Sequence, residues 1–123
     1  MIKHFRDLDV WKIAHGFVLK IYSVTKGFPV TEKFGLTTQI QRAAVSITAN
    51  IAEGFSRYYF KDRVRFYYQS RGSMSEVENL LIIAKDIGYL NDHTLEYLIK
   101  DVERIQSILN GLIRKTSNLS SQK

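Results

Sequence analysis

Apolar residues recur along most of this chain at intervals of three and four positions, and this spacing predicts α-helices rather than β-strands. Four segments show it: about 8–25, 31–57, 60–87 and 92–115. Thr31 is expected to be the N-cap of the second helix, and Asn91 or Asp92 that of the fourth. Gly88 is expected to end the third, because glycine adopts positive φ without a Cβ clash. Such a chain most simply forms an all-α, antiparallel up-down-up-down four-helix bundle.

A single domain is expected to span residues 1–123, with a flexible polar tail at 116–123. The chain contains one proline and no cysteine, so burial of apolar side chains must stabilise it. Its N-terminus lacks the apolar core of a signal peptide, and no stretch approaches the ~20 apolar residues of a membrane span. A cytoplasmic location and no membrane partner are therefore expected.

The second predicted helix is almost free of charge. From Phe34 to Ser56 the only charged residues are Arg42 and Glu53. A helix with one face in water normally carries several charges, so this helix is expected to be buried on nearly all sides. A single four-helix bundle leaves one side of each helix exposed. The sequence therefore predicts that further copies of the chain cover this helix in a homo-oligomer.

Polar residues of the second helix follow one another at spacings of three and four, which places them on one stripe: Gln39, Arg42, Ser46, Asn50 and Glu53. Beside it runs an apolar stripe: Leu36, Ile40, Ala43, Ile47 and Ile51. One interpretation is that the polar stripe faces solvent. The other is a polar seam between helices or subunits, because an antiparallel hairpin sets Arg42 level with Glu76 and Glu53 near Arg63 and Arg65. Such charge pairs would fix the register of the two helices.

Small residues interrupt the middle of the third predicted helix: Ser70, Gly72, Ser73 and Ser75. Glycine inside a helix costs about 1 kcal/mol relative to alanine, so its presence favours close approach by a neighbouring backbone. Simple tolerance of poor helix formers is the alternative.

The sequence offers no set of catalytic or metal-binding residues. The histidines, His4, His15 and His93, are far apart and lack the spacing of a helical metal site. No hydrolase triad and no glycine-rich phosphate-binding loop is present. The chain is therefore expected to act without catalysis, metal or cofactor.

Basic residues are concentrated in one part of the chain. The formal net charge is +6, and residues 42–75 carry six Lys and Arg against two acidic residues. The stretch from Phe55 to Arg71 mixes seven aromatic residues with five cations: Arg57, Lys61, Arg63, Arg65 and Arg71. Cations neutralise phosphates and exposed rings stack on unpaired bases, so these five are candidate nucleic-acid-binding residues. In the alternative interpretation, apolar residues of this stretch face the core and the cations form an ordinary solvent-exposed face: Phe60, Val64, Tyr67 and Met74 inside, Lys61 and Arg65 outside.

Several motifs together resemble the 23S rRNA intervening sequence protein family over essentially the whole chain. They occupy residues 5–11, 28–39, 42–54, 72–76 and 88–90, and the run from Ser46 to Gly54 is the most specific. The resemblance implies an up-down four-helix bundle that assembles into a homopentamer with a basic surface. Some members are encoded within ribosomal RNA intervening sequences. One branch is similar to the accessory variability determinant, which binds nucleic acid and works with a reverse transcriptase.

These features together predict a non-enzymatic, homo-oligomeric bundle that binds RNA or an RNA/DNA hybrid through phosphate contacts. Ribosomal RNA and a reverse transcriptase are the partners that the resemblance suggests. The alternative function is a structural or protein-partner adaptor whose basic surface docks an acidic protein and has no role with nucleic acid.

Overall fold

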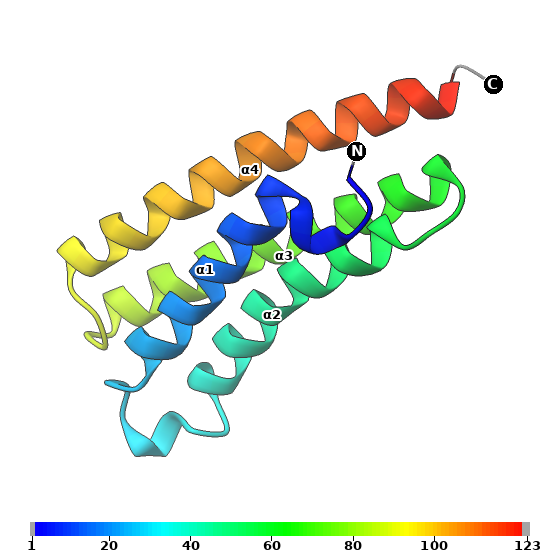
Figure 1. Cartoon of the computed structure of the whole chain (residues 1–123). Coiled ribbons are helices and arrows are strands. Elements are labelled where there is room, and N and C mark those ends of the chain that lie inside the picture. Colours follow the sequence, from blue (N-terminus) through cyan, green and yellow to red (C-terminus); the bar gives the residue numbers. More distant parts are fainter. Residues whose placement is uncertain (1, 122–123) are drawn as a thin grey trace.

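The computed structural model describes residues 2–121, and within them the chain forms four α-helices and no strand. The elements are η1 (Phe5–Asp7), α1 (Asp9–Thr25), η2 (Val30–Glu32), α2 (Leu36–Phe55), α3 (Phe60–Asp86) and α4 (Asp92–Ser121), where η denotes a short 3-10 helix. The long helices pack side by side (Figure 1). The α1–α2 and α3–α4 connections lie at one end of the molecule, and the α2–α3 connection lies at the other, with the N-terminal segment and the end of α4. The prediction of an all-α chain of four helices packed as a bundle is confirmed.

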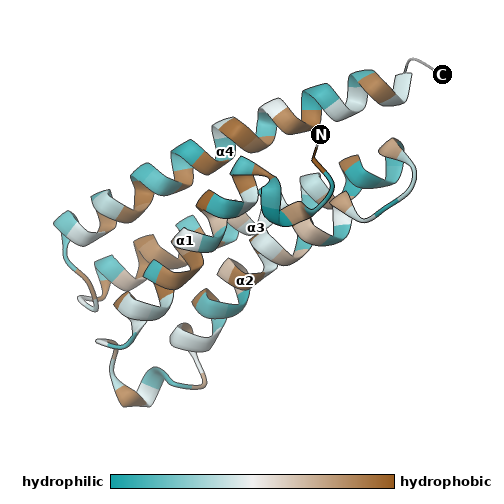
Figure 2. Cartoon of the chain, viewed as in Figure 1, coloured by the Kyte–Doolittle hydropathy of each residue, from teal (hydrophilic) through white to brown (hydrophobic). Residues whose placement is uncertain are grey.

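The core runs along the bundle and receives buried side chains from every long helix. Figure 2 shows hydrophobic and hydrophilic residues alternating along the helices as amphipathic helices require. The apolar stripe predicted for the second helix is confirmed as its core face, since Ile40, Ala43, Ile47 and Ile51 are buried and Leu36 packs against them in part. An ion pair of 2.7 Å between Lys20 and Asp101 joins α1 to α4.

Local chemistry explains where three of the helix ends fall. Gly88 follows α3 with a φ of +91°, as predicted, and the side chain of Asn91 accepts a hydrogen bond of 2.8 Å from the backbone N–H of Thr94 at the start of α4. The expected start of the second helix at Thr31 is wrong. Residues 30–32 form η2, and α2 begins only at Leu36, whose N–H donates to the Glu32 carboxylate at 3.1 Å.

The fourth helix extends further than the sequence predicted. Helix α4 continues through residues 116–121, most of the expected tail, and residues 122–123 lie outside the described part. Thr116 is buried, and its hydroxyl donates a hydrogen bond of 2.7 Å to the carbonyl of Leu112 one turn earlier. This back-bonding satisfies the hydroxyl inside the helix, so a polar sequence does not end it.

Helices α2 and α3 approach each other closely. Ser70 donates a hydrogen bond of 2.8 Å to the carbonyl of Ile47, and the hydroxyls of Ser46 and Ser73 are 2.8 Å apart. A Cβ added to Gly54 would stand 2.8 Å from Cβ of Phe66. The predicted close approach is thus confirmed at Ser70 and Ser73. At Gly72 and Ser75 the prediction of a close approach is wrong within a single chain. Both residues are exposed, and a Cβ added to Gly72 would meet nothing within 4 Å.

The polar stripe of α2 divides between two environments rather than forming one charge-paired seam. Ser46 and Asn50 are partly buried and hydrogen-bonded to each other, whereas Gln39, Arg42 and Glu53 are exposed. Glu53 pairs at 2.8 Å with Arg57, which follows the end of its helix, and not with Arg63 or Arg65.

No ion pair among residues 2–121 includes Arg42 or Glu76, so the expected pair between them is wrong within one chain. Both side chains are exposed, which keeps them outside the contact between α2 and α3. Helix α2 also leaves Val45 and Ala49 exposed, so a single chain does not bury it on nearly all sides. That further copies of the chain cover helix α2 stays a prediction.

A polar contact joins the two connections at one end of the bundle. The hydroxyl of Tyr89 donates to the Glu32 carboxylate at 2.7 Å, and this bond, with that from Leu36 N–H, lowers the pKa of Glu32 below its ordinary 4.5. A depressed folded-state pKa stabilises the protein above pH 4.5, and the contribution is lost as pH falls through the folded pKa. We expect Tyr89→Phe, which keeps the ring against Phe28, to lower the melting temperature more at pH 7 than near pH ~3. An equal deficit at both pH values would contradict this origin of the stability.

The structure also bears on membrane insertion. None of the helices within residues 2–121 combines the length and the apolar character that a membrane-spanning segment requires.

Candidate nucleic-acid interface

Three stretches of the chain meet at one end of the bundle. The Ser46–Ser73 contact aligns α2 with α3, and a hydrogen bond of 3.1 Å from Arg71 to Asn110 aligns α3 with α4. Leu8, from the segment before α1, lines a common cavity with Leu119 near the end of α4. Residues 2–14, 45–74 and 107–121 therefore share this part of the molecule, here called the basic end (Figure 1).

The net charge of the protein is concentrated in the basic end. It holds ten Lys and Arg against four Asp and Glu, a difference of +6: Lys3, Arg6, Lys12, Arg57, Lys61, Arg63, Arg65, Arg71, Arg114 and Lys115 against Asp7, Asp9, Glu53 and Asp62. The remaining described residues, 15–44 and 75–106, hold seven against eight, a difference of −1. The molecule is therefore electrically polarised along its length. Such a field attracts polyanions to one end and orients them before contact.

Two of the five predicted cations, Arg57 and Arg63, take part in building the α2–α3 turn. The Arg57 guanidinium lies 2.8 Å from Glu53 and 4.6 Å from the centre of the Phe66 ring. Arg63 donates a hydrogen bond of 2.8 Å to the carbonyl of Arg57, and it stacks on Phe55 with 4.9 Å to the ring centre. Both contribute to the local field, while part of their donor capacity is used within the protein.

The other three predicted cations are exposed. Arg65 lies 3.5 Å from Asp62 in a surface ion pair, a type that contributes little and breaks easily. Arg71, besides its bond to Asn110, covers the ring of Tyr68 at 4.6 Å. The Lys61 side chain has no hydrogen bond or ion pair with any residue that the structure describes. These side chains present positive charge to solvent without strong internal competition.

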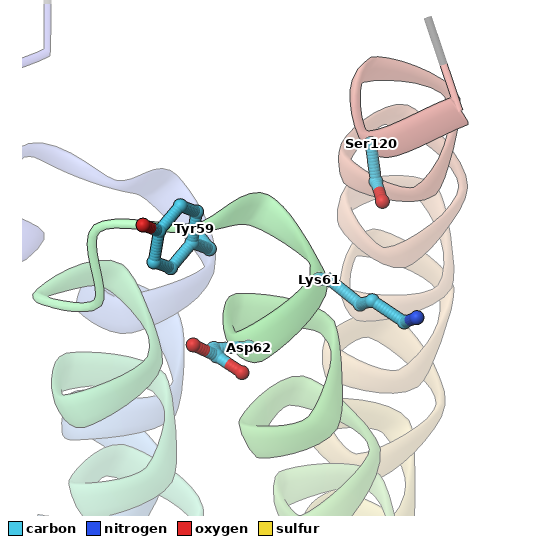
Figure 3. A pocket seen from close by; sticks show the side chains of 4 residues that line it. All are labelled: Tyr59, Lys61, Asp62 and Ser120. Carbon is cyan, nitrogen blue, oxygen red and sulfur yellow. The ribbon is translucent and has the colours of Figure 1, made fainter. Parts of the chain in front are cut away.

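A shallow hollow of about 320 Å³ lies beside Lys61, between the start of α3 and the end of α4. Figure 3 shows the Lys61 side chain extending from α3 towards α4, where Ser120 projects from the last turns. Tyr59 and Asp62 complete the lining. The hollow adds a cation and a hydroxyl to the surface of the basic end, and Asp62 moderates its charge.

The aromatic residues of this region serve two roles. Tyr67 and Met74 are buried, and Phe60 and Val64 are partly buried, as the alternative interpretation of this stretch expected. Tyr58, by contrast, is 85% exposed at the α2–α3 turn. The stretch thus supplies the core from one side and the basic end from the other, so the two interpretations are compatible.

Sequence reasoning missed five further cations of the basic end: Lys3, Arg6, Lys12, Arg114 and Lys115. They lie near the two ends of the chain, far in sequence from the 57–71 stretch, and only the packing of α4 and the N-terminal segment brings them to it. In the sequence, only a surplus of positive charge indicates these five residues.

The histidines do not form a site. Within residues 2–121 no group of three or more His, Cys, Asp and Glu side chains is arranged to hold a metal ion. His15 instead stacks on Trp11 with 4.8 Å between the ring centres.

Comparison with known proteins adds two findings. The model of a family described as 23S rRNA-intervening sequence protein matches residues 6–111. The fold is similar to the crystal structure of a protein of unknown function from the S23 ribosomal protein family of Bacteroides thetaiotaomicron, with a TM-score of 0.77 and 25% sequence identity over 85% of this chain and 97% of that one. A search of curated proteins found no match.

Proposed function

Because the chain belongs to the 23S rRNA-intervening sequence protein family, we propose that it is a non-enzymatic, homo-oligomeric bundle that binds RNA or an RNA/DNA hybrid through its basic end. The observation that carries the proposal is the difference of +6 between basic and acidic residues at that end, against −1 in the rest of residues 2–121. The proposed location is the cytoplasm.

Phosphate contacts supply most of the proposed affinity. Lys61, Arg65 and Lys115 are exposed, so they reach a phosphate backbone without breaking a buried contact. Each phosphate that they neutralise releases condensed counterions, a favourable entropy that does not depend on base sequence. The family name links its members to 23S rRNA, which makes a structured ribosomal RNA fragment the first probe.

Assembly of several chains is the second part of the proposal. In an antiparallel up-down-up-down bundle, the outer surface of α2, of α3 and of the residue after α3 leaves apolar side chains without cover: Val45 is 41% exposed, Ile83 41% and Ile87 53%. Copies packed through this surface would cover the helix that is almost free of charge, and a pentamer is the form that the family resemblance implies. Each added copy contributes another basic end, so polyanion binding gains by multivalency.

The proposed assembly predicts a change of mass in one variant. Ile83→Glu buries a carboxylate in the subunit contact, so we expect dissociation towards a single chain at micromolar concentration in sedimentation equilibrium. Ser107→Glu, an equally charged change on the exposed side of α4, is the control and keeps the wild-type mass. A wild type that sediments as one chain contradicts the assembly.

The proposed binding predicts a steep response to salt. We expect log affinity for the RNA fragment to fall linearly with log salt, with a slope of about −3 or steeper, as for several phosphate contacts. Fluorescence anisotropy between about 50 and 300 mM salt measures it. No binding at the lowest salt favours the second candidate, an adaptor for an acidic protein. A reverse transcriptase is the proposed protein partner in either case.

A further inference from the structure

A mostly apolar cavity of about 390 Å³ opens in the basic end. It lies between the end of α2, the start of α3, the end of α4 and the segment before α1. Three aromatic side chains contribute to its walls, Phe55, Phe60 and Tyr67, and the two cations that line it are Arg63 and Lys115. No carboxylate among residues 2–121 lines it. Its volume falls within the range of small-molecule sites.

One buried residue with a polar group, Tyr67, lines this space. Tyr67 is 1% exposed, and its hydroxyl makes no hydrogen bond with any residue that the structure describes. Because Tyr67 lines the cavity, we place its unpartnered hydroxyl at the cavity wall. Burial raises the pKa of Tyr67, so the phenol stays protonated at neutral pH and can donate a hydrogen bond.

We propose that this cavity accepts an unpaired nucleobase of the strand held by the basic end, an inference that rests on the proposed function. A base is flat and apolar on its faces and carries hydrogen-bonding groups at its edge. The partly buried ring of Phe55 and the apolar walls suit its faces, and the Tyr67 hydroxyl suits an acceptor at its edge. The flanking phosphates stay outside, within reach of Lys115 at the cavity and of other cations of the basic end.

The surroundings favour a nucleotide strand over other apolar ligands. A lone hydrophobic anion needs one cation, whereas two cations line this cavity, and the basic end around it holds ten Lys and Arg against four acidic residues. A duplex keeps its bases stacked and paired, so extrusion costs a few kcal/mol, while a single strand offers them at little cost. The expected ligand is therefore a strand with accessible bases.

Two oligonucleotides of equal charge test the inference: a 12-residue deoxyadenosine strand and a 12-residue strand of abasic sites. We expect the wild type to bind the first about tenfold more tightly, because stacking adds to equal phosphate contacts.

Thr116→Leu fills the cavity without adding a ring and is expected to remove most of this preference while the affinity for the abasic strand is unchanged. Thr116→Ser is the matched control and retains the preference. Tyr67→Phe keeps the buried aromatic ring and removes only the hydroxyl. It is expected to reduce the preference for the deoxyadenosine strand about threefold.

The outcomes separate this inference from the function on which it rests. If both strands bind equally and with steep salt dependence, the cavity takes no base and the proposed function stands. If neither binds at low salt, both fail. If the preference survives Thr116→Leu and Tyr67→Phe but is lost in Tyr58→Ser, the bases stack on the exposed turn and the cavity inference is overturned.

Discussion

Replacing Lys61, Arg65 and Lys115 together with glutamine is expected to weaken RNA binding by about 100-fold at low salt. The three side chains are exposed and come from two helices of the basic end. Each phosphate contact changes the salt slope by about 0.9, so the triple variant should also show a slope shallower by about 2 to 3. Anisotropy titrations across salt concentrations measure both quantities.

A matched variant separates the basic end from total charge. Lys26, Lys100 and Arg104 are exposed, lie outside the basic end and have no ion pair with a described residue. Changing them to glutamine lowers the net charge by the same three, and we expect less than about a threefold loss of affinity. Equal losses in the two variants would mean that the protein attracts RNA by its overall charge alone.

Adding one methyl group at Gly54 is expected to destabilise the fold strongly. In Gly54→Ala the new Cβ would lie 2.8 Å from Cβ of Phe66 and 2.9 Å from Cε1 of Tyr67, so α2 and α3 must separate. Overpacking of this kind costs about 1–3 kcal/mol, and the gain in helix propensity of about 1 kcal/mol offsets only part of this range. We expect the melting temperature at fixed protein concentration to fall by about 5 °C, and further in Gly54→Val.

Gly16→Ala is the control for this effect. Gly16 lies within α1, and a Cβ there would meet nothing within 4 Å, so only the helix propensity changes. The free energy of unfolding is expected to rise by about 0.5–1 kcal/mol. A stable Gly54→Ala variant would contradict the close contact between α2 and α3.

Much of the fold was predictable because its signals are local. Apolar spacing located all four helices, and Gly88 and Asn91 marked the boundary between α3 and α4 through their own backbone and side-chain chemistry. The start of α2 was not predictable in this way. A good N-cap residue, Thr31, precedes it, yet the helix begins after Gly35, where the Glu32 carboxylate accepts the Leu36 N–H across a loop.

Contacts that depend on helix rotation were harder to predict. The level of a residue in a hairpin follows from counting, but counting does not say which way its side chain points. Arg42 and Glu76 thus fall level in the expected hairpin yet both lie exposed, whereas Ser46 and Ser73 meet in the interface.

The candidate site was predictable only in part for the same reason. The 57–71 stretch is visible as a cluster in the sequence, but the cations near the two ends of the chain join it only through tertiary packing. Sequence also does not distinguish Lys61, which has no internal partner among residues 2–121, from Arg63, which bonds to the carbonyl of Arg57.

Chemical modification of lysines with and without bound RNA shows directly whether RNA binds at the basic end. Peptide mass spectrometry reports the reactivity of each amine in the wild-type protein, with no mutation required. We expect RNA to protect Lys3, Lys61 and Lys115 at the basic end, while Lys26, Lys33 and Lys100 react as in the free protein. Protection of the second group in place of the first would contradict it.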